Sequence, residues 1–474
     1  MNTKTLSIEP ISFGEAKTNQ STSGKPLITF NGVNCGSETF TIKMSFFELI
    51  QFTEVANERS TNSEVAQRPL DIKHATAIAK YMVKGLLHAV YLKRQKQNIP
   101  TEGKLDDIIK DMGQQPYFAL APIVTSFRNC SPNGTNLKVI PQITFNDETI
   151  AYKIFLSNGD VLWVVDGQHR RKAAELVLDF LKDICTTHKY SKGSLYPTKY
   201  KEQISSEELS VWSECLEASK QCTLTIDIHL GLGIEQERQL FHDLNNLVKR
   251  VEKSLALKFD ASNPVNQYIK EVLIDDKFDA IGFDVNEKDQ SEWTKNGLSR
   301  KELVAINALL FLNKTNISGA LPTVVEPRLP IADKYWDSVL NITDITISDA
   351  KLKTVAAQPV VLKAIAKLYF DFFFGKNDLF TMPENQEKLM QGISTLDFSH
   401  TNPMWGYYTL TDDQKESDDF KGLKEYLPED DGKNRDLGNY DSTKTFRFGA
   451  KHNDIFPIIG DMIRWKLGLP SRKK

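Results

Sequence analysis

Hydrophobic and polar residues alternate with a period of two in several short stretches of the first half of the chain, the pattern of strands with one buried face. Residues 26–47 alternate in this way through LITFNGV and TFTIKM, and the intervening Asn31-Gly32 predicts a β-hairpin. The apolar run 117–124 contains Pro122, which lacks a backbone donor, so we expect an edge strand or a strand end there. Further strands are predicted over 137–145, 150–155, 161–165 and 222–230.

Between these strands the apolar positions change to the spacing of an amphipathic helix. Residues 71–90 show it first, and the chain after residue 168 and the stretch 234–247 show it again. Strands that alternate with helices predict an α/β domain. Helical spacing then dominates the rest of the chain, at 264–274, 299–312, 334–341 and 359–375.

This change of pattern predicts the domain organisation. We expect a flexible polar lead over residues 1–25, an α/β domain over 26–262 and a mainly α-helical domain over 263–474. The stretch 411–443 is dense in Asp, Lys and Gly, and is predicted to be an exposed charged loop of the helical domain.

Charge and cysteine content narrow the classes of protein that fit. Lys and Arg total 59 against 62 Asp and Glu, so the net charge is -3 and contact with nucleic acid would need a local basic patch. The five cysteines include no CxxC pair, which favours reduced thiols over disulfides or a zinc ribbon. No signal peptide or long apolar run is present, so we expect a cytoplasmic protein without a membrane partner.

The sharpest chemical signal lies where the apolar strand 161–165 ends and a helix begins. The first N–H groups of a helix attract anions, and Gly167 lets a ligand approach the backbone closely. Arg170 and Arg171 add guanidinium donors that suit phosphate oxygens. His169 offers a proton carrier, and Asp166 a carboxylate that can orient it, cap the helix or hold a metal ion.

A purely structural interpretation of this turn stays open. An Asp-Gly turn is a common way to end a strand, and two arginines in the first turn of a helix can simply be solvated. Arginine is mildly unfavourable at a helix N-terminus, however, because the dipole there is positive. Two arginines at that place therefore favour a bound anion.

The pentapeptide from Asp166 to Arg170 resembles the motif that names the DGQHR proteins, the family of DndB and its relatives. It is also similar to the glycine-centred phosphate turn of the ParB/sulfiredoxin superfamily. Residues 67–70 with the helix after them, and 237–245, are similar to further family segments, so that the resemblance covers roughly residues 60–260. It implies a ParB/sulfiredoxin-like α/β domain ahead of the helical one.

The resemblance also implies site residues, a ligand and partners. The ligand would be ATP or another nucleotide with Mg²⁺, or the phosphates of DNA. Phosphate contacts would come from Gly167, Gln168, His169, Arg170, Arg171, Arg68, Arg238 and Asn245, with Asp243 as a further candidate. Asp166, His169 and Glu237 would be catalytic if the nucleotide is hydrolysed, and Arg68, Lys249 and Arg250 would contact DNA. Ordinary solvated helix faces remain the alternative for Glu237 to Asn245 and for Lys249 and Arg250.

Two weaker signals complete the candidates. Asp227 and His229 lie on one face of a strand and suggest a metal or an acid–base pair, but a third ligand is missing and we predict no metal site. Arg464, Lys466 and the terminal Ser471-Arg-Lys-Lys474 form a basic run that suits DNA or a solvated tail.

Three functions follow from the resemblance and stay open. The first is a nucleotide-binding, ATP-hydrolysing component of a DNA-modification defence system of the phosphorothioation type, or an ATPase partner of a deazapurine-inserting enzyme. The second is a DNA-binding regulator of such a cluster without catalysis, and the third is a small-molecule kinase. A P-loop is absent, and Gln168 replaces the reactive cysteine of sulfiredoxins. Expected partners are DNA, other proteins of the gene cluster and a second copy of the chain.

Overall fold

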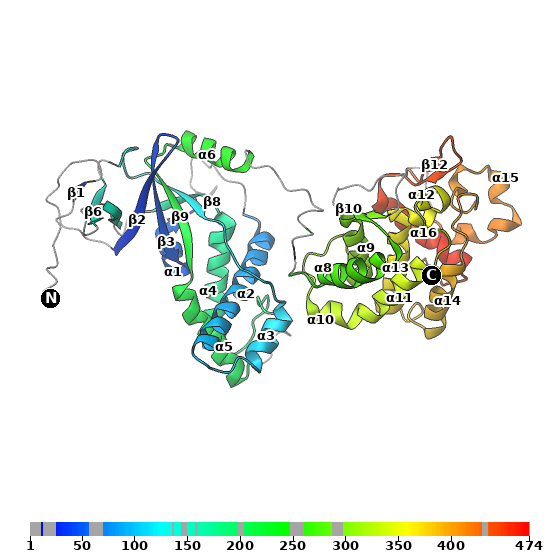
Figure 1. The fold of residues 1–474 in the computed structure, drawn as a ribbon, viewed down its shortest axis with the longest axis horizontal. Helices are drawn as coiled ribbons and strands as arrows, with labels where there is room; N and C mark the ends of the chain where they lie inside the picture. The colour runs from blue at the N-terminus through cyan, green and yellow to red at the C-terminus, as the bar shows by residue number, and fades with distance from the viewer. Residues whose placement is uncertain are drawn as a thin grey trace. The chain divides into compact units, whose positions relative to one another are not determined.

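The computed structural model describes residues 11–12, 25–55, 70–134, 137–143, 149–156, 160–197, 203–246, 257, 260, 262–286, 297–428 and 435–473. The chain divides into two compact units, Met1–Lys249 and Arg250–Lys474. The first is a mixed α/β unit, and the second is almost entirely helical (Figure 1). The division falls shortly before the expected boundary after residue 262.

A mixed sheet of nine strands forms the framework of the first unit, in the order β1-β6-β7-β2-β3-β9-β5-β8-β4. β5 runs parallel to β9 and antiparallel to β8, while β4 runs parallel to β8. The strands are β1 Ile11–Ser12, β2 Lys25–Asn34, β3 Ser37–Ser45, β4 Thr53–Glu54, β5 Ile123–Phe127, β6 Lys138–Ile143, β7 Thr149–Leu156, β8 Leu162–Asp166 and β9 Thr223–Leu230.

The predicted hairpin is confirmed as β2–β3, but its turn lies elsewhere. Asn31 and Gly32 pair within the ladder, and the chain reverses at Cys35 and Gly36, between the paired Asn34 and Ser37. Both turn residues have positive φ, as a tight two-residue hairpin turn requires. The run 117–124 is also corrected. Its first six residues are not a strand, and β5 begins at Ile123, directly after the proline that cannot donate to a ladder.

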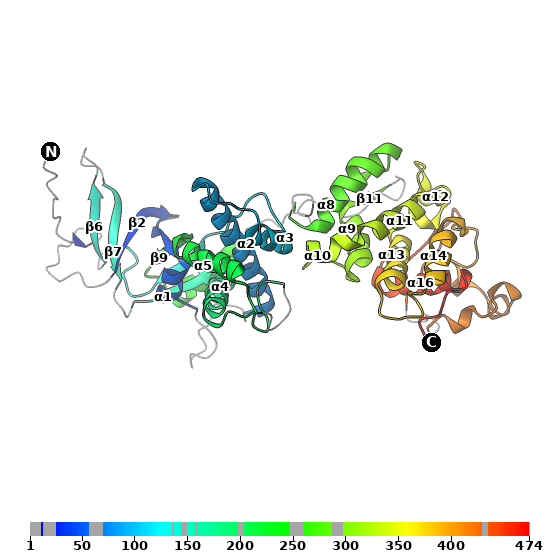
Figure 2. The ribbon, with the colours of Figure 1, turned by 90° about the horizontal axis from the view of Figure 1, so that it is seen from below.

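In the described part of the first unit, α1 to α5 belong to one layer, and Figures 1 and 2 show α2, α4 and α5 side by side. Their apolar stripes bury, for example, Leu86 of α2, Leu181 of α4 and Trp212 of α5. The sixth helix, α6, lies apart from this layer, beside β8 (Figure 1). The helices are α1 Phe46–Phe52, α2 Ile72–Lys96, α3 Lys104–Met112, α4 Gln168–Thr187, α5 Ser206–Gln221 and α6 Ile234–Asn246.

The second unit packs its helices around α13, whose apolar face contacts α9 and α16. Its longer helices are α9 Arg300–Leu312, α11 Leu329–Leu340, α13 Pro359–Phe374, α14 Pro383–Thr395, α16 His452–Lys466 and the π-helix η1 Ile269–Phe278, which continues α8 Pro264–Tyr268. Short elements complete it: η2 Asp279–Ile281, α10 Pro322–Val325, η3 Glu326–Arg328, α12 Ala350–Lys353, η4 Val355–Ala357, η5 Tyr407–Thr409, α15 Asp412–Lys415, η6 Asp418–Phe420, η7 Leu423–Glu425, β10 Val285–Asn286, β11 Leu298–Ser299, β12 Asn439–Tyr440 and β13 Phe446–Arg447.

Most described residues of the stretch 411–443 are exposed, but the stretch is not without secondary structure. Its described part contains α15, η6, η7 and β12, and it buries Phe420, Leu423 and Leu427. Three apolar anchors among many charged residues are enough to fold short helical turns onto the core. None of the described helices is both long and apolar enough to cross a membrane.

Candidate phosphate-binding site

The turn between β8 and α4 depends on the glycine at its centre. Gly167 adopts φ 101° and ψ 17°, the left-handed region, and α4 begins at the next residue. A Cβ at this position would lie 2.9 Å from Cγ1 of Ile123 and 3.0 Å from Nε and Nη2 of Arg170. The backbone and the crowding therefore both require glycine here. The absent side chain leaves room for the guanidinium of Arg170 against the turn.

Asp166 and Arg170 form an ion pair across the first turn of α4. Nη2 of Arg170 donates to Oδ2 of Asp166 at 2.5 Å, and the two side chains are 20% and 37% exposed respectively. Nε of Arg170 is buried and has no hydrogen-bond partner among the described residues. A buried donor of a charged group is costly to leave unsatisfied, which makes this Nε an unusual feature of the turn.

His169 links the turn to the start of α2. Its Nε2 accepts the backbone N–H of Asp71 at 3.1 Å, and its ring lies edge-on to that of His74, with centroids 4.9 Å apart. Burial lowers the pKa of His169, and the neighbouring His74 and Arg170 lower it further against the opposing effect of Asp71. An accepting Nε2 and a lowered pKa both describe a neutral ring with its proton on Nδ1.

These residues border a hollow of about 260 Å³. Its wall brings together the turn, the start of α2 and the last part of α6, and comprises His74, Ile78, Val165, Asp166, Gly167, Gln168, His169, Arg170, Phe241 and Asn245. The resemblance implied phosphate contacts from both Gly167 and Asn245, and the structure places both on this wall. Nδ2 of Asn245 donates to the carbonyl of Phe241 at 2.7 Å.

Arg171 does not belong to this site, although the sequence grouped it with Arg170. Its Nε and Nη2 donate to the carbonyl oxygen of Thr53 at 3.0 and 2.7 Å, and Nε also donates to Oγ1 of Thr53 at 2.9 Å. Thr53 follows the last residue of α1, so Arg171 supplies donors to a helix C-terminus. Adjacent residues of a helix point about 100° apart, and this rotation separates the two arginines.

Glu237, the other predicted catalytic carboxylate, does not border the hollow and pairs with Arg128 instead. Its carboxylate is 3% exposed and receives two hydrogen bonds from Arg128, at 2.8 Å from Nε and 2.6 Å from Nη2. The guanidinium carbon of Arg128 also lies 4.7 Å from the ring centre of Trp163. Glu237 is the one fully buried residue of α6 among the described residues, so this pair fastens α6 to the sheet.

Two further predicted residues of α6, Arg238 and Asp243, do not line the hollow. Arg238 is exposed on α6 and does not border it. Oδ1 of Asp243 accepts from Gln239 at 2.7 Å and lies 3.1 Å from Nδ1 of His242. Arg68, Lys249 and Arg250 are not among the described residues.

The two weaker candidates have structural partners. Oδ1 of Asp227 accepts from Oγ1 of Thr41 at 2.8 Å, and the described residues contain no cluster able to hold a metal ion. In the basic run near the C-terminus, Arg464 is buried and pairs with Asp371 at 3.0 Å. Arg472 pairs with the buried Asp461 at 2.7 Å. The buried Arg464 is therefore not part of an exposed basic tail, whereas Arg472 is 44% exposed.

Sequence reasoning missed Asp71, His74 and Phe241 as neighbours of the turn. Asp71 could have been recognised as an N-cap, since its side chain accepts from the backbone N–H groups of Lys73 and His74. Nothing in the local sequence indicated that the first turn of α2 would meet His169, because the two segments are 98 residues apart.

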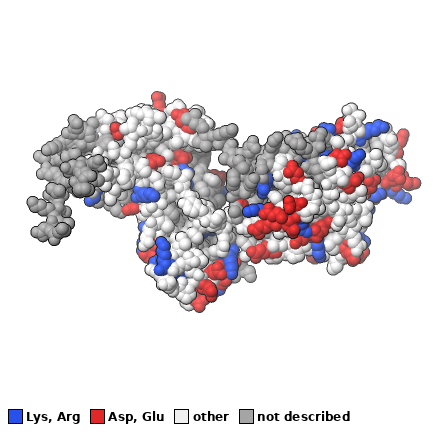
Figure 3. Space-filling model, viewed as in Figure 1, with Lys and Arg blue, Asp and Glu red and all other residues white. Residues whose placement is uncertain are grey.

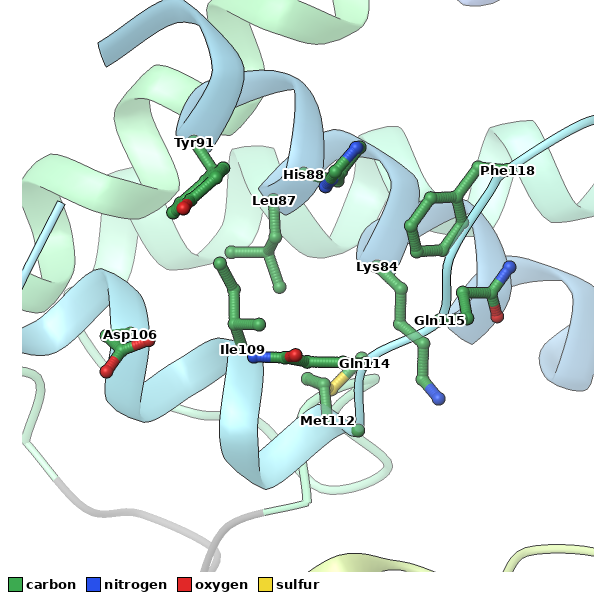
Figure 4. A pocket seen from close by; sticks show the side chains of 11 residues that line it. Lys84, Leu87, His88, Tyr91, Asp106, Ile109, Met112, Gln114, Gln115 and Phe118 are labelled. Atoms are coloured by element: carbon green, nitrogen blue, oxygen red, sulfur yellow. The ribbon is translucent and has the colours of Figure 1, made fainter. Parts of the chain in front are cut away.

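A second hollow of the first unit, of about 200 Å³, lies between α2 and α3. Figure 4 shows Lys84, Leu87 and His88 from α2 opposite Ile109 and Met112 from α3. Its wall mixes single polar groups with apolar side chains and shares no residue with the DGQHR turn.

The sequence matches the profile of the DndB family, described as DNA-sulfur modification-associated, over residues 27–434. The chain belongs to this family. The resemblance to DndB is thereby confirmed, and the match continues into the second unit, where the sequence offered no motif. Membership associates the chain with DNA sulfur modification. No curated protein and no solved structure matches it.

Proposed function

We propose that the hollow at the DGQHR turn binds a phosphate group, carried by a nucleotide or by DNA, and that the protein regulates a DNA sulfur modification system through this site. The observation that carries the proposal is Arg170. Its guanidinium is oriented by Asp166, while its buried Nε has no partner among the described residues. Such a preoriented donor, beside a glycine and a helix N-terminus, suits a phosphate oxygen.

The other residues of the wall have separate parts in this proposal. The neutral His169 contacts the ligand without adding charge, and Asn245 approaches from α6 on the opposite side. We further propose that the first unit is of the ParB/sulfiredoxin type, where a comparable turn holds nucleotide phosphates. Asp166 would hold the Mg²⁺ of a bound nucleotide, because it is the carboxylate on this wall.

Regulation without strong autonomous DNA binding fits the distribution of charge. On the face of the second unit seen in Figure 3, acidic side chains gather over the region of α8 and η1. Glu271, Asp275, Asp276 and Asp279 are exposed there. Such a face repels the DNA backbone, so phosphate recognition would depend on local sites. DNA, proteins of the same gene cluster and a second copy of the chain are the proposed partners.

The test is a binding titration of the full chain with Mg²⁺-ATP and, separately, with duplex DNA, together with an assay for released phosphate. Arg170→Ala should weaken binding of one ligand at least tenfold, the cost of losing a hydrogen bond to a charged group. Lys172→Ala is the matched control, since it removes the same charge from a side chain paired with Glu175 at 3.0 Å, outside the hollow.

The outcomes separate the functions. Phosphate release that disappears in Asp166→Ala would make the protein a nucleotide hydrolase, and loss of duplex binding alone would make it a DNA-binding regulator. If Arg170→Ala binds both ligands as tightly as Lys172→Ala does, the turn is structural and the proposal is wrong.

A further inference from the structure

The second unit contains a hollow of about 730 Å³ where the N-terminal ends of α9, α13 and α16 meet. All three helices are longer than twelve residues, and each contributes residues of its first turn to the wall. The wall comprises Lys301, Glu302, Ala305, Lys351, Gln358, Pro359, Val360, Lys363, Phe448, Ala450, Lys451, His452, Asn453 and Asp454. This place is unrelated to the DGQHR turn, which belongs to the first unit.

Positive charge dominates this wall, with four lysines against Glu302 and Asp454. Oε2 of Glu302 accepts from the backbone N–H and the hydroxyl of Ser299, at 2.8 and 2.9 Å, as part of the cap of α9. Asp454 is exposed at the rim. Among the described residues of this wall, positive side chains thus outnumber negative ones.

Two of the lysines are withdrawn from solvent, which is unusual for this residue type. Lys351 is 3% exposed, and Nζ of Lys363 lies 3.2 Å from Nδ1 of His452. Burial lowers the pKa of both lysines, while Glu302 raises it. Burial, followed by the charge of Lys363, lowers the pKa of His452 to about 4, so that its neutral ring accepts from the ammonium group.

The ammonium groups of Lys301, Lys351 and Lys363 border one hollow, and a bound anion would lower the repulsion among them. The helix N-termini act in the same direction, since their dipoles favour negative charge. Neither Gln358 of α13 nor Lys451 of α16 caps its helix through a side-chain hydrogen bond. Lysine ammonium groups and helix N-termini together are the donors that phosphate groups use in proteins.

The hollow continues into a more apolar one of about 650 Å³, and the two share Lys301, Ala305, Lys363 and Asn453. This adjoining apolar hollow is lined by Val304, Leu309 and Ile317, and its polar groups include Asp260, Asn263 and Asn316. An apolar wall with a few polar groups is typical of a site for a flat organic ring. A ligand with a phosphate at one end and a nucleobase at the other therefore fits the lysine-lined hollow and the adjoining apolar hollow together.

We propose that the second unit holds a binding site for a nucleoside phosphate, distinct from the DGQHR hollow. The phosphate groups contact Lys301, Lys351 and Lys363 at the three helix N-termini, and the nucleoside lies against Val304, Leu309 and Ile317. Through this site a small molecule binds the second unit, which does not contain the DGQHR turn.

Calorimetric titration of the full chain carrying Arg170→Ala tests this site separately from the first one. The probes are ATP and pyrophosphate without metal, and 20-base-pair duplex DNA. We expect ATP to bind more tightly than pyrophosphate, and Lys301→Ala and Lys363→Met each to weaken both by about tenfold or more. Lys388→Ala is the control, because that lysine is exposed and pairs with Glu384 at 2.9 Å.

Each other outcome overturns the proposal. Undiminished ATP binding in Lys301→Ala and Lys363→Met, with unchanged melting temperatures, would show that the lysines hold no ligand. If ATP binds no more tightly than pyrophosphate, the nucleoside makes no contact with the adjoining apolar hollow. Binding of the duplex alone would replace the small ligand by DNA. Loss of ATP binding in the Arg170→Ala chain before any lysine is changed would assign all nucleotide binding to the DGQHR turn.

Discussion

Asp166 and Arg170 are four residues apart and face each other across one turn of α4, with Nη2 and Oδ2 separated by 2.5 Å. The pair fixes the plane of the guanidinium and leaves Nε as a buried donor without a partner among the described residues. The last residue of β8 thus orients a side chain of the helix that follows it. The DGQHR sequence supplies both partners and the glycine that leaves space between them.

The Nε group can be tested apart from the positive charge. Arg170→Lys keeps the charge and a contact to Asp166, but it removes the planar donor fork. We expect binding of the phosphate ligand to fall about tenfold, the cost of one charged hydrogen bond. The free energy of unfolding should change by no more than about 1 kcal/mol, because a partly exposed ion pair contributes little. Full binding by Arg170→Lys would mean that charge alone recruits the ligand.

Arg171 should behave in the opposite way from its neighbour. Arg171→Ala removes the donors that satisfy the Thr53 carbonyl after α1, and burial of those groups makes the loss costly. We expect chemical denaturation to show a destabilisation of about 2–3 kcal/mol, with ligand affinity unchanged. Lys172→Ala on the same turn should leave both unchanged within about 0.5 kcal/mol. If Arg171→Ala keeps its stability but binds the phosphate ligand weakly, Arg171 belongs to the binding site after all.

The contrast between these arginines shows where the sequence was informative. The strand, the glycine turn and the helix could be predicted from local pattern alone, because apolar runs and turn residues act over a few positions. The family resemblance grouped Asn245 with the turn, and the structure places it on the wall of the same hollow. The separation of Arg170 from Arg171 depends on where α1 ends, a tertiary fact that no local spacing records.

Long-range pairs explain the other differences. Glu237 was assigned to catalysis because carboxylates near a phosphate turn serve that purpose. Its partner Arg128 lies 109 residues away, so the pairing could not be predicted from spacing. The basic composition near the C-terminus likewise suggested a DNA contact, but Arg464 is buried beside Asp371. A run of charged residues in the sequence predicts a solvated surface only where folding does not place a residue of opposite charge beside it.

Glu237 is predicted to hold α6 in place. Glu237→Gln removes the buried negative charge that pairs with Arg128 at 2.6 Å, which should cost about 2–3 kcal/mol. The loss should be local, because α6 buries little else among the described residues. Hydrogen exchange should therefore speed up in α6 before it does in α4, whereas Glu235→Gln, exposed on the same helix, should leave exchange unchanged. Uniform faster exchange throughout the first unit would contradict a local role.

Gly167 carries a steric prediction with an internal control. Gly167→Ala adds the cost of a left-handed residue, about 1 kcal/mol, and pushes its Cβ against Nε and Nη2 of Arg170. We expect ligand binding to be lost together with some stability. Gly193 has a similar φ of 85° and nothing within 4 Å of its Cβ position, so Gly193→Ala should show the backbone cost alone. Equal ligand affinity in the two variants would argue against crowding at Arg170.

The neutral state of His169 predicts a dependence of stability on pH. Its folded pKa lies below the ordinary value of 6.5, chiefly because the ring is buried, so the unfolded chain binds the proton more readily. The contribution to stability is therefore complete above about pH 6.5 and is lost as the pH falls through the folded pKa. Protonation also ends the acceptance of the Asp71 N–H by Nε2 and should loosen the start of α2. Denaturation of the wild type and of His169→Gln between pH 5 and about pH 8 measures this, since glutamine does not titrate. The stability difference between them should shrink on acidification. Parallel curves over this range would show that His169 does not titrate between the two states.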